Sequence, residues 1–238
     1  MGGLLNVILN RGSIFEIIAC LISATVVVFL TMPLHEYAHG FTATKLGDPT
    51  PRWQGRMSLN PMRHVDYVGA LMIYLIGFGY AKPVQVDARY FNNPKRDMAI
   101  VALAGPLSNL LFALASTLIS NLVMFIFVLI GGATGGLYYL FVVLYNVFVY
   151  IAYINIMLAV FNLVPVPPLD GSKVLGAFLP NRIYYQLMQY ERYFMIFVFF
   201  LVFAGTGFSN GLSKIVAMIF NGFDVITAWP FDLILKNF

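Results

Sequence analysis

Three apolar runs with few or no charged residues are the feature that most limits how this chain can fold. They cover Ile14 to Thr31, Leu137 to Leu163 and Met195 to Phe203. About 20 apolar residues in a helix are enough to cross the hydrocarbon layer of a membrane. Only 10% of the 238 residues are charged, whereas about a quarter are charged in an ordinary soluble domain. The sequence therefore predicts a polytopic membrane protein.

Five segments are predicted to span the membrane, and a sixth is too short to cross. The five run from Ile14 to Lys45, Met98 to Ile130, Leu137 to Asn162, Tyr193 to Phe208 and Leu212 to Leu235. The sixth, Val68 to Tyr80, fits a re-entrant or interfacial element buried against protein. We expect an all-α polytopic fold of about five transmembrane helices plus this short segment. It would form a single domain over residues 1–238, with a motif-bearing core at about 14–180 and C-terminal helices at about 193–235.

Lysine and arginine are divided unequally between the two sides of the predicted membrane. Arg11 and Lys214 are on one side, and twelve are on the other: Lys45, Arg52, Arg56, Arg63, Lys82, Arg89, Lys95, Arg96, Lys173, Arg182, Arg192 and Lys236. Cytoplasmic loops are enriched in these residues. We therefore expect residues 45–97 and 165–192 in the cytoplasm and the N-terminus outside. The net charge of +4 then reflects membrane topology and gives no support to nucleic-acid binding.

His35, Glu36 and His39 form a His-Glu-x-x-His motif at the end of the first predicted span. Histidines four positions apart share one face of a helix and can bind one zinc ion, while the glutamate can act on a water at the metal. The alternative is a group of polar residues tolerated at a helix end. Three ionisable groups so close together in an apolar helix are costly unless they face a polar cavity or a metal. The motif therefore favours a metal site.

A catalytic zinc site needs a third protein ligand, and the candidates are His64 and the carboxylates. Asp170 stands out because three prolines interrupt the third span just before it and Gly171 permits a sharp turn after it. Irregular backbone at membrane depth must be buried in protein or line a water-filled cavity. We therefore expect this loop to line the site. The alternative is that Asp170 caps a helix from Ser172 to Leu179.

These motifs resemble those of the site-2 protease family of intramembrane zinc metalloproteases, peptidase family M50, in its compact prokaryotic form without a PDZ domain. The resemblance covers most of residues 30–180. The shared motifs are His35 to His39, Leu46-Gly47-Asp48, Gly55 to Pro61 with His64 and Asp66, Lys82-Pro83-Val84, Ala104 to Asn109 and Asn162 to Gly171.

The resemblance implies one Zn²⁺ per chain, bound by His35, His39 and Asp170. It also implies that Glu36 is the catalytic base and that Asn162 contacts the substrate or the oxyanion. The implied reaction is hydrolysis of a peptide bond within a transmembrane segment of a substrate protein, near the cytoplasmic side of the cell membrane and surrounded by membrane lipid. The alternative is a metal-binding scaffold or transporter without hydrolytic activity, but the sequence shows no repeats typical of a transporter.

Three further features have alternative interpretations. His64 either hydrogen-bonds water or Asp66 at the interface, or lines the metal site. Asn109, within an apolar helix, is expected to hydrogen-bond another helix. Lys82 to Asp87 alternates enough to be a strand whose exposed edge could bind an unwound substrate. Otherwise this stretch only ends the short apolar segment.

Overall fold

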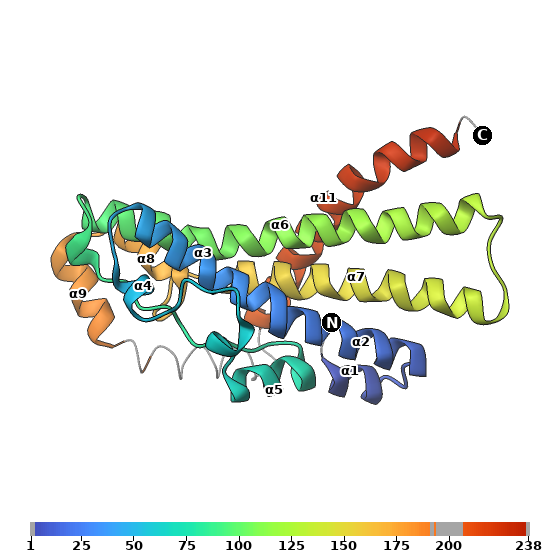
Figure 1. Ribbon diagram of the computed structural model, residues 1–238, viewed down its shortest axis with the longest axis horizontal. Helices are drawn as coiled ribbons and strands as arrows, with labels where there is room; N and C mark the ends of the chain where they lie inside the picture. Colours follow the sequence, from blue (N-terminus) through green and yellow to red (C-terminus); the bar gives the residue numbers. More distant parts are fainter. Residues whose placement is uncertain (1–2, 191–192, 194–206, 237–238) are drawn as a thin grey trace.

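The structure is a computed structural model that describes residues 3–190, 193 and 207–236. All regular secondary structure in these residues is helical (Figure 1). Four segments are long and apolar enough to cross a membrane: Ile14–Lys45, Pro94–Leu129, Gly135–Asn162 and Asn210–Leu235. They coincide with four of the five expected spans. The remaining one, Tyr193 to Phe208, lies largely outside the described residues.

The first span is a continuous helical segment that carries the His-Glu-x-x-His motif. It consists of α2 (Ile14–Val26), the π-helical turn η1 (Val27–Thr31) and α3 (Met32–Lys45), after a short α1 (Leu4–Leu9). Pro33 lacks an N–H, and in a regular helix its ring would clash with the carbonyl four residues earlier. The wider π turn immediately before Pro33 accommodates this ring. The helix therefore continues through the proline to His35.

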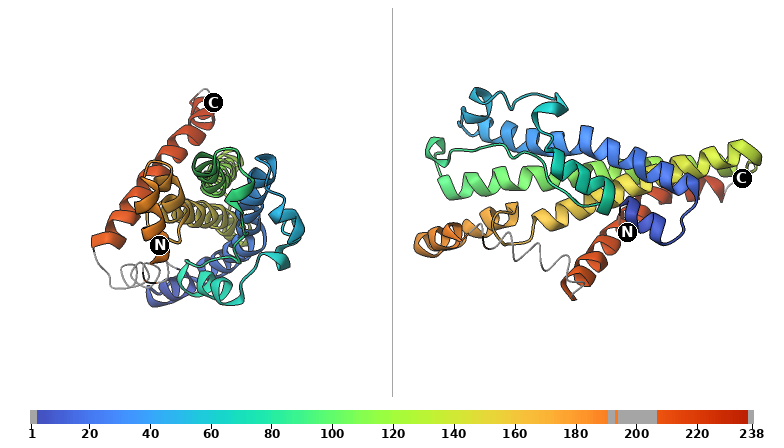
Figure 2. Two further views of the ribbon diagram at one scale, coloured as in Figure 1. Left: turned by 90° about the vertical axis from the view of Figure 1, so that its left-hand side faces the viewer. Right: turned by 90° about the horizontal axis from the view of Figure 1, so that it is seen from below.

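Two long antiparallel helices, α6 (Pro94–Leu129) and α7 (Gly135–Asn162), form the centre of the molecule (Figure 1). Ala113 of α6 and Ala152 of α7 are fully buried in one cluster with Ile156. Such small residues let membrane helices approach closely. The first span lies on one side of this pair, and α8 (Asp170–Gly176) and α11 (Gly207–Leu235) lie on the other (Figure 2).

The short apolar segment forms α5 (Tyr67–Ile76). Asp66 caps its N-terminus, and Gly77 ends it in the left-handed conformation. The chain then turns back, and the Lys82 N–H donates a hydrogen bond to the His64 carbonyl at 2.8 Å. The residues that flank the segment, His64 and Lys82, are therefore adjacent.

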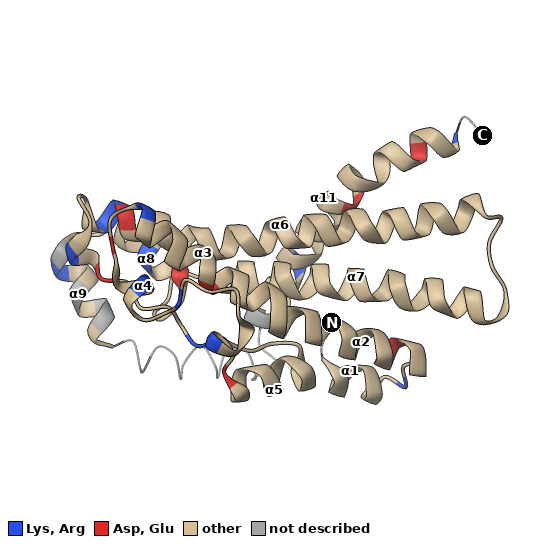
Figure 3. Cartoon of the chain, in the orientation of Figure 1, with Lys and Arg blue, Asp and Glu red and all other residues tan. Residues whose placement is uncertain are grey.

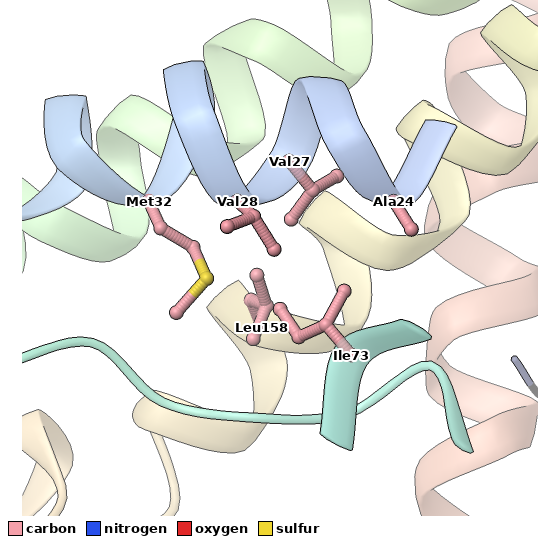
Figure 4. Close-up of a cluster of buried hydrophobic side chains, with 6 residues drawn as sticks. All are labelled: Ala24, Val27, Val28, Met32, Ile73 and Leu158. Carbon is pink, nitrogen blue, oxygen red and sulfur yellow. The ribbon is translucent and has the colours of Figure 1, made fainter. Parts of the chain in front are cut away.

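A cluster of buried apolar side chains holds α5 against the first span and α7 (Figure 4). The cluster consists of Ala24, Val27, Val28, Met32, Ile73 and Leu158. In Figure 4 the side chains of the first span face Ile73 of α5 and Leu158 of α7. This contact fixes α5 beside the helix that carries the motif.

The strand expected over Lys82 to Asp87 is not formed. These residues have no regular secondary structure, and the described part of the chain contains no strand with which they could pair. The Val84 N–H donates to the Glu36 carboxylate, and the Asp87 N–H donates to the Asp48 carboxylate. The alternating sequence therefore marks an irregular segment whose backbone N–H groups bond to carboxylate side chains.

Lysine and arginine gather at one end of the molecule, around α8, α9 (Asn181–Gln189) and the start of α6 (Figure 3). The connection between α6 and α7 lies at the opposite end. The C-terminal end of α11 also points toward that opposite end (Figures 1 and 2). This differs from the sequence-based expectation that placed Lys236, just after α11, together with the other cytoplasmic basic residues.

Candidate metal centre

Three side chains from the first span and α8 converge on one point. The Nε2 atoms of His35 and His39 are 3.1 Å apart. Oδ2 of Asp170 lies 3.5 Å from Nε2 of His35 and 3.2 Å from Nε2 of His39. Each residue is only 8% exposed. Among the described residues this is the one group of three or more His, Cys, Asp or Glu side chains that could hold a metal ion.

The spacing of these three atoms fits zinc. Ligand atoms 2.0–2.1 Å from a tetrahedral zinc ion are about 3.3 Å from one another. The three separations of 3.1, 3.2 and 3.5 Å lie on both sides of this value. Two histidines and one carboxylate also leave the fourth position open, as catalytic zinc sites require.

The backbone of α6 fixes the orientation of His39. Its Nδ1 lies 2.8 Å from the carbonyl oxygen of Val101. Because a carbonyl only accepts, Nδ1 must carry the hydrogen, and Nε2 then presents its lone pair to the site. A hydrogen bond of this kind on the far nitrogen is the usual way in which a protein orients a metal-binding histidine.

Gly105 allows α6 to pass close to both histidine rings. A Cβ atom at this position would lie 2.6 Å from Cε1 of His35 and closer still to the His39 ring. No role for Gly105 was predicted from the sequence. The sequence feature that indicates such a role is Gly105 followed by Pro106 within an apolar helix. Both residue types disfavour helix formation, so their presence there suggests a close packing contact.

The loop between α7 and α8 brings Asp170 to the histidines. Asp170 is the first residue of α8, and Leu169 occupies the N-cap position, so the alternative role of Asp170 as a helix cap is not seen. Burial raises the pKa of Asp170, but His39, His35 and Lys173 lower it more, and the pKa lies well below its usual range. The carboxylate is therefore ionised, as a metal ligand must be.

Glu36 lies beside this group and is 8% exposed. Its Oε2 accepts a hydrogen bond from the Val84 N–H at 2.8 Å. One carboxylate oxygen is thus engaged by the backbone, which leaves the other to take a proton. The structure therefore brings together His35, Glu36, His39 and Asp170, four of the five site residues that the sequence predicted.

The other candidate residues are placed differently. Asn162 is the last residue of α7 and partly buried, and its contact with the oxyanion stays a prediction. His64 is fully buried, and its Nε2 lies 2.8 Å from the Ser58 carbonyl oxygen, so it belongs to the loop and not to the metal group. Asn109 is buried on α6, and its Oδ1 has no hydrogen-bond partner in the described part of the chain.

Comparison with known proteins agrees with this geometry. The model of peptidase family M50 matches residues 23–205. This chain belongs to peptidase family M50. Zinc is therefore its cofactor, and the group formed by His35, His39 and Asp170 could hold the ion.

The curated relatives of this M50 protein are bacterial. "Putative zinc metalloprotease YwhC" of Bacillus subtilis is 34% identical over 180 residues, covering 75% of this chain and 78% of the relative. "Putative zinc metalloprotease Rip2" of Mycolicibacterium smegmatis is 28% identical over 153 residues, covering 61% of this chain and 53% of the relative. "Putative zinc metalloprotease Rip2" of Mycobacterium tuberculosis is 27% identical over 184 residues, covering 74% of this chain and 65% of the relative. No solved structure matches the M50 protein.

Proposed function

We propose that this M50 protein is an intramembrane zinc endopeptidase that cleaves a peptide bond in the transmembrane segment of a substrate protein. One observation carries the proposal: Nε2 of His35, Nε2 of His39 and Oδ2 of Asp170 lie 3.1–3.5 Å apart, beside Glu36. A site that only stores or transports a metal has no use for an adjacent carboxylate held as a base.

Each residue of the group has a role in this reaction. Zinc, when bound, polarises a carbonyl group and lowers the pKa of a ligated water to about 7. His35, His39 and Asp170 would hold the ion. Glu36 takes the proton of the attacking water and passes it to the leaving amine. Asn162 is proposed to donate a hydrogen bond to the developing oxyanion, an interaction typically worth about 3 kcal/mol.

The substrate must unwind before it can be cut, because a helix keeps its carbonyl groups in internal hydrogen bonds. Lys82 to Asp87 lies beside Glu36 and has no regular secondary structure. An unwound substrate is proposed to bind alongside this segment, since extended backbones pair readily with each other. Gly, Asn or Pro in the substrate would ease the unwinding.

The site is proposed to lie on the cytoplasmic side of the cell membrane. His35 is 21 residues after Ile14, near the end of a helix that rises ~1.5 Å per residue. Lysine and arginine gather at the same end of the molecule (Figure 3), and such residues favour the cytoplasm. Water for hydrolysis would reach the site from that side.

Incubation of the zinc-loaded protein with reporter transmembrane segments tests the proposal. Mass spectrometry of the products should place the cuts in the cytoplasmic half of the reporter helix. A zinc chelator should stop cleavage. Glu36→Gln should keep zinc but lose activity by at least the ~100-fold that general-base catalysis supplies. Zinc binding without cleavage of any membrane segment would instead support a non-hydrolytic metal-binding protein.

A further inference from the structure

Asp48 is a fully buried carboxylate that lies outside the metal group. It follows α3 and is 0% exposed. Its Oδ1 accepts the Thr50 N–H and its Oδ2 accepts the Asp87 N–H, each at 2.9 Å. A buried polar group needs such hydrogen-bond partners. Asp48 therefore ties the end of the motif helix to the end of the Lys82–Asp87 segment.

The Lys82–Asp87 segment is held at three points. Its first N–H donates to the His64 carbonyl at 2.8 Å, and its last N–H donates to Asp48. Between them, the Val84 N–H donates to Oε2 of Glu36 at 2.8 Å. The two outer attachments therefore keep Val84 in place against the glutamate.

Packing on α3 supports the same arrangement. Gly40 lies one helical turn after Glu36 and faces the segment, since a Cβ at this position would be 3.6 Å from Cγ1 of Val84. The segment thus lies directly against the helix that bears the glutamate. A shift at either end would withdraw the Val84 N–H from Oε2.

We propose that Asp48 is a positioning residue for proton transfer by Glu36, and that it acts by holding the Val84 N–H against the glutamate carboxylate. This rests on the proposed function, in which Glu36 is the base. With Oε2 held by the backbone, the other oxygen points in one direction. Misplacement of a reacting group by 1 Å can cost about 100-fold in rate, so a fixed carboxylate has a large effect.

Asp48→Asn tests the link in the full-length, zinc-loaded protein. An amide has a single acceptor oxygen, and its NH₂ group would face an N–H donor, so one of the two bonds is lost. We expect kcat on a reporter segment to fall about 10- to 100-fold with zinc content unchanged. Hydrogen exchange of residues 82–87, followed by mass spectrometry, should become faster.

Asp66→Ala is the matched control. Asp66 also accepts two backbone N–H bonds, from Val68 and Gly69 at 3.0 Å, but it caps α5 and does not bond the Lys82–Asp87 segment. This control should keep wild-type kcat and wild-type exchange in residues 82–87. An equal fall in kcat for the two variants would mean that any loss of a loop anchor has this effect, and the proposal would be wrong.

A second pair of variants applies if Asp48→Asn does not fold or loses zinc. Val84→Pro removes the N–H that bonds Glu36. Leu59→Pro makes the same change at an exposed residue outside the segment, where the N–H has no hydrogen bond to any described residue. The first should lower kcat at full zinc content and the second should not; equal activities would overturn the proposal. If the zinc-loaded wild-type protein cleaves no membrane segment, the proposed function is refuted. The hydrogen-exchange measurement would then still decide whether Asp48 holds the Lys82–Asp87 segment.

Discussion

At the residue scale, groups outside the metal site decide how its side chains point. The Val101 carbonyl fixes the ring of His39, and Gly105 leaves space for both histidine rings. The His-Glu-x-x-His motif predicted the two histidines and the glutamate, and the loop with three prolines predicted Asp170. The roles of Val101 and Gly105 could not be predicted, because they depend on how α6 packs against α3.

The metal content of single-residue variants tests the three ligands. We expect about one zinc per wild-type chain, and none in His35→Ala, because two remaining ligands do not complete a catalytic zinc site. Asp170→Ala should behave in the same way. His64→Gln is the control, since the glutamine amide nitrogen can take the place of Nε2 and donate to the Ser58 carbonyl, and His64 lies outside the group. Metal analysis of purified protein decides; full zinc occupancy in His35→Ala would contradict the assignment.

At the element scale, hydropathy predicted five spans, and four of them coincide with long apolar helices of the described residues, because crossing a membrane requires about 20 apolar residues in sequence. The same pattern could not predict the state of Lys82 to Asp87. An alternating sequence indicates an extended backbone, but it does not say which groups accept the N–H bonds. Here the acceptors are Glu36 and Asp48, which are 48 and 39 positions away from their donors. Contacts over such distances are set by packing of the whole chain.

The packing of α5 on the first span can be tested within one helix. Ile73 is 1% exposed and Leu71 is 57% exposed. Ile73→Ala should lower the free energy of unfolding by about 2–5 kcal/mol, the usual cost of removing a buried side chain of this size. Leu71→Ala should change it little. Unfolding of detergent-solubilised protein measures both, and equal effects would show that Ile73 is not a core residue.

At the scale of the whole molecule, the count of lysine and arginine and the structure agree on where most basic residues gather. They differ on the position of the C-terminal end of α11. The basic residues around α8, α9 and the start of α6 lie together (Figure 3). The C-terminal end of α11 lies instead toward the connection between α6 and α7. The count assumed that five apolar segments each cross the membrane once. Sequence alone could not show the direction in which α11 runs relative to α7.

Labelling of single cysteines tests this arrangement in a Cys20→Ser background. The substituted positions are Asn92, Thr134 and Lys236, all exposed. A membrane-impermeant reagent should reach Asn92 from the cytoplasm and Thr134 from outside. Lys236 should be labelled from the same side as Thr134, because α11 ends toward the α6–α7 connection. Labelling of Lys236 together with Asn92 would favour the orientation expected from the charge count.

The metal group joins two halves of the chain that only the connection after α6 links covalently. His35 and His39 belong to the half before this connection, and Asp170 belongs to the half after it. Zinc binding therefore also favours association of the two halves. A ligand that binds only the assembled form stabilises that form by about 2.7 kcal/mol when the free ligand concentration is 100 times its Kd. Two fragments divided at the α6–α7 connection and produced together would then form a split enzyme whose reassembly depends on the metal.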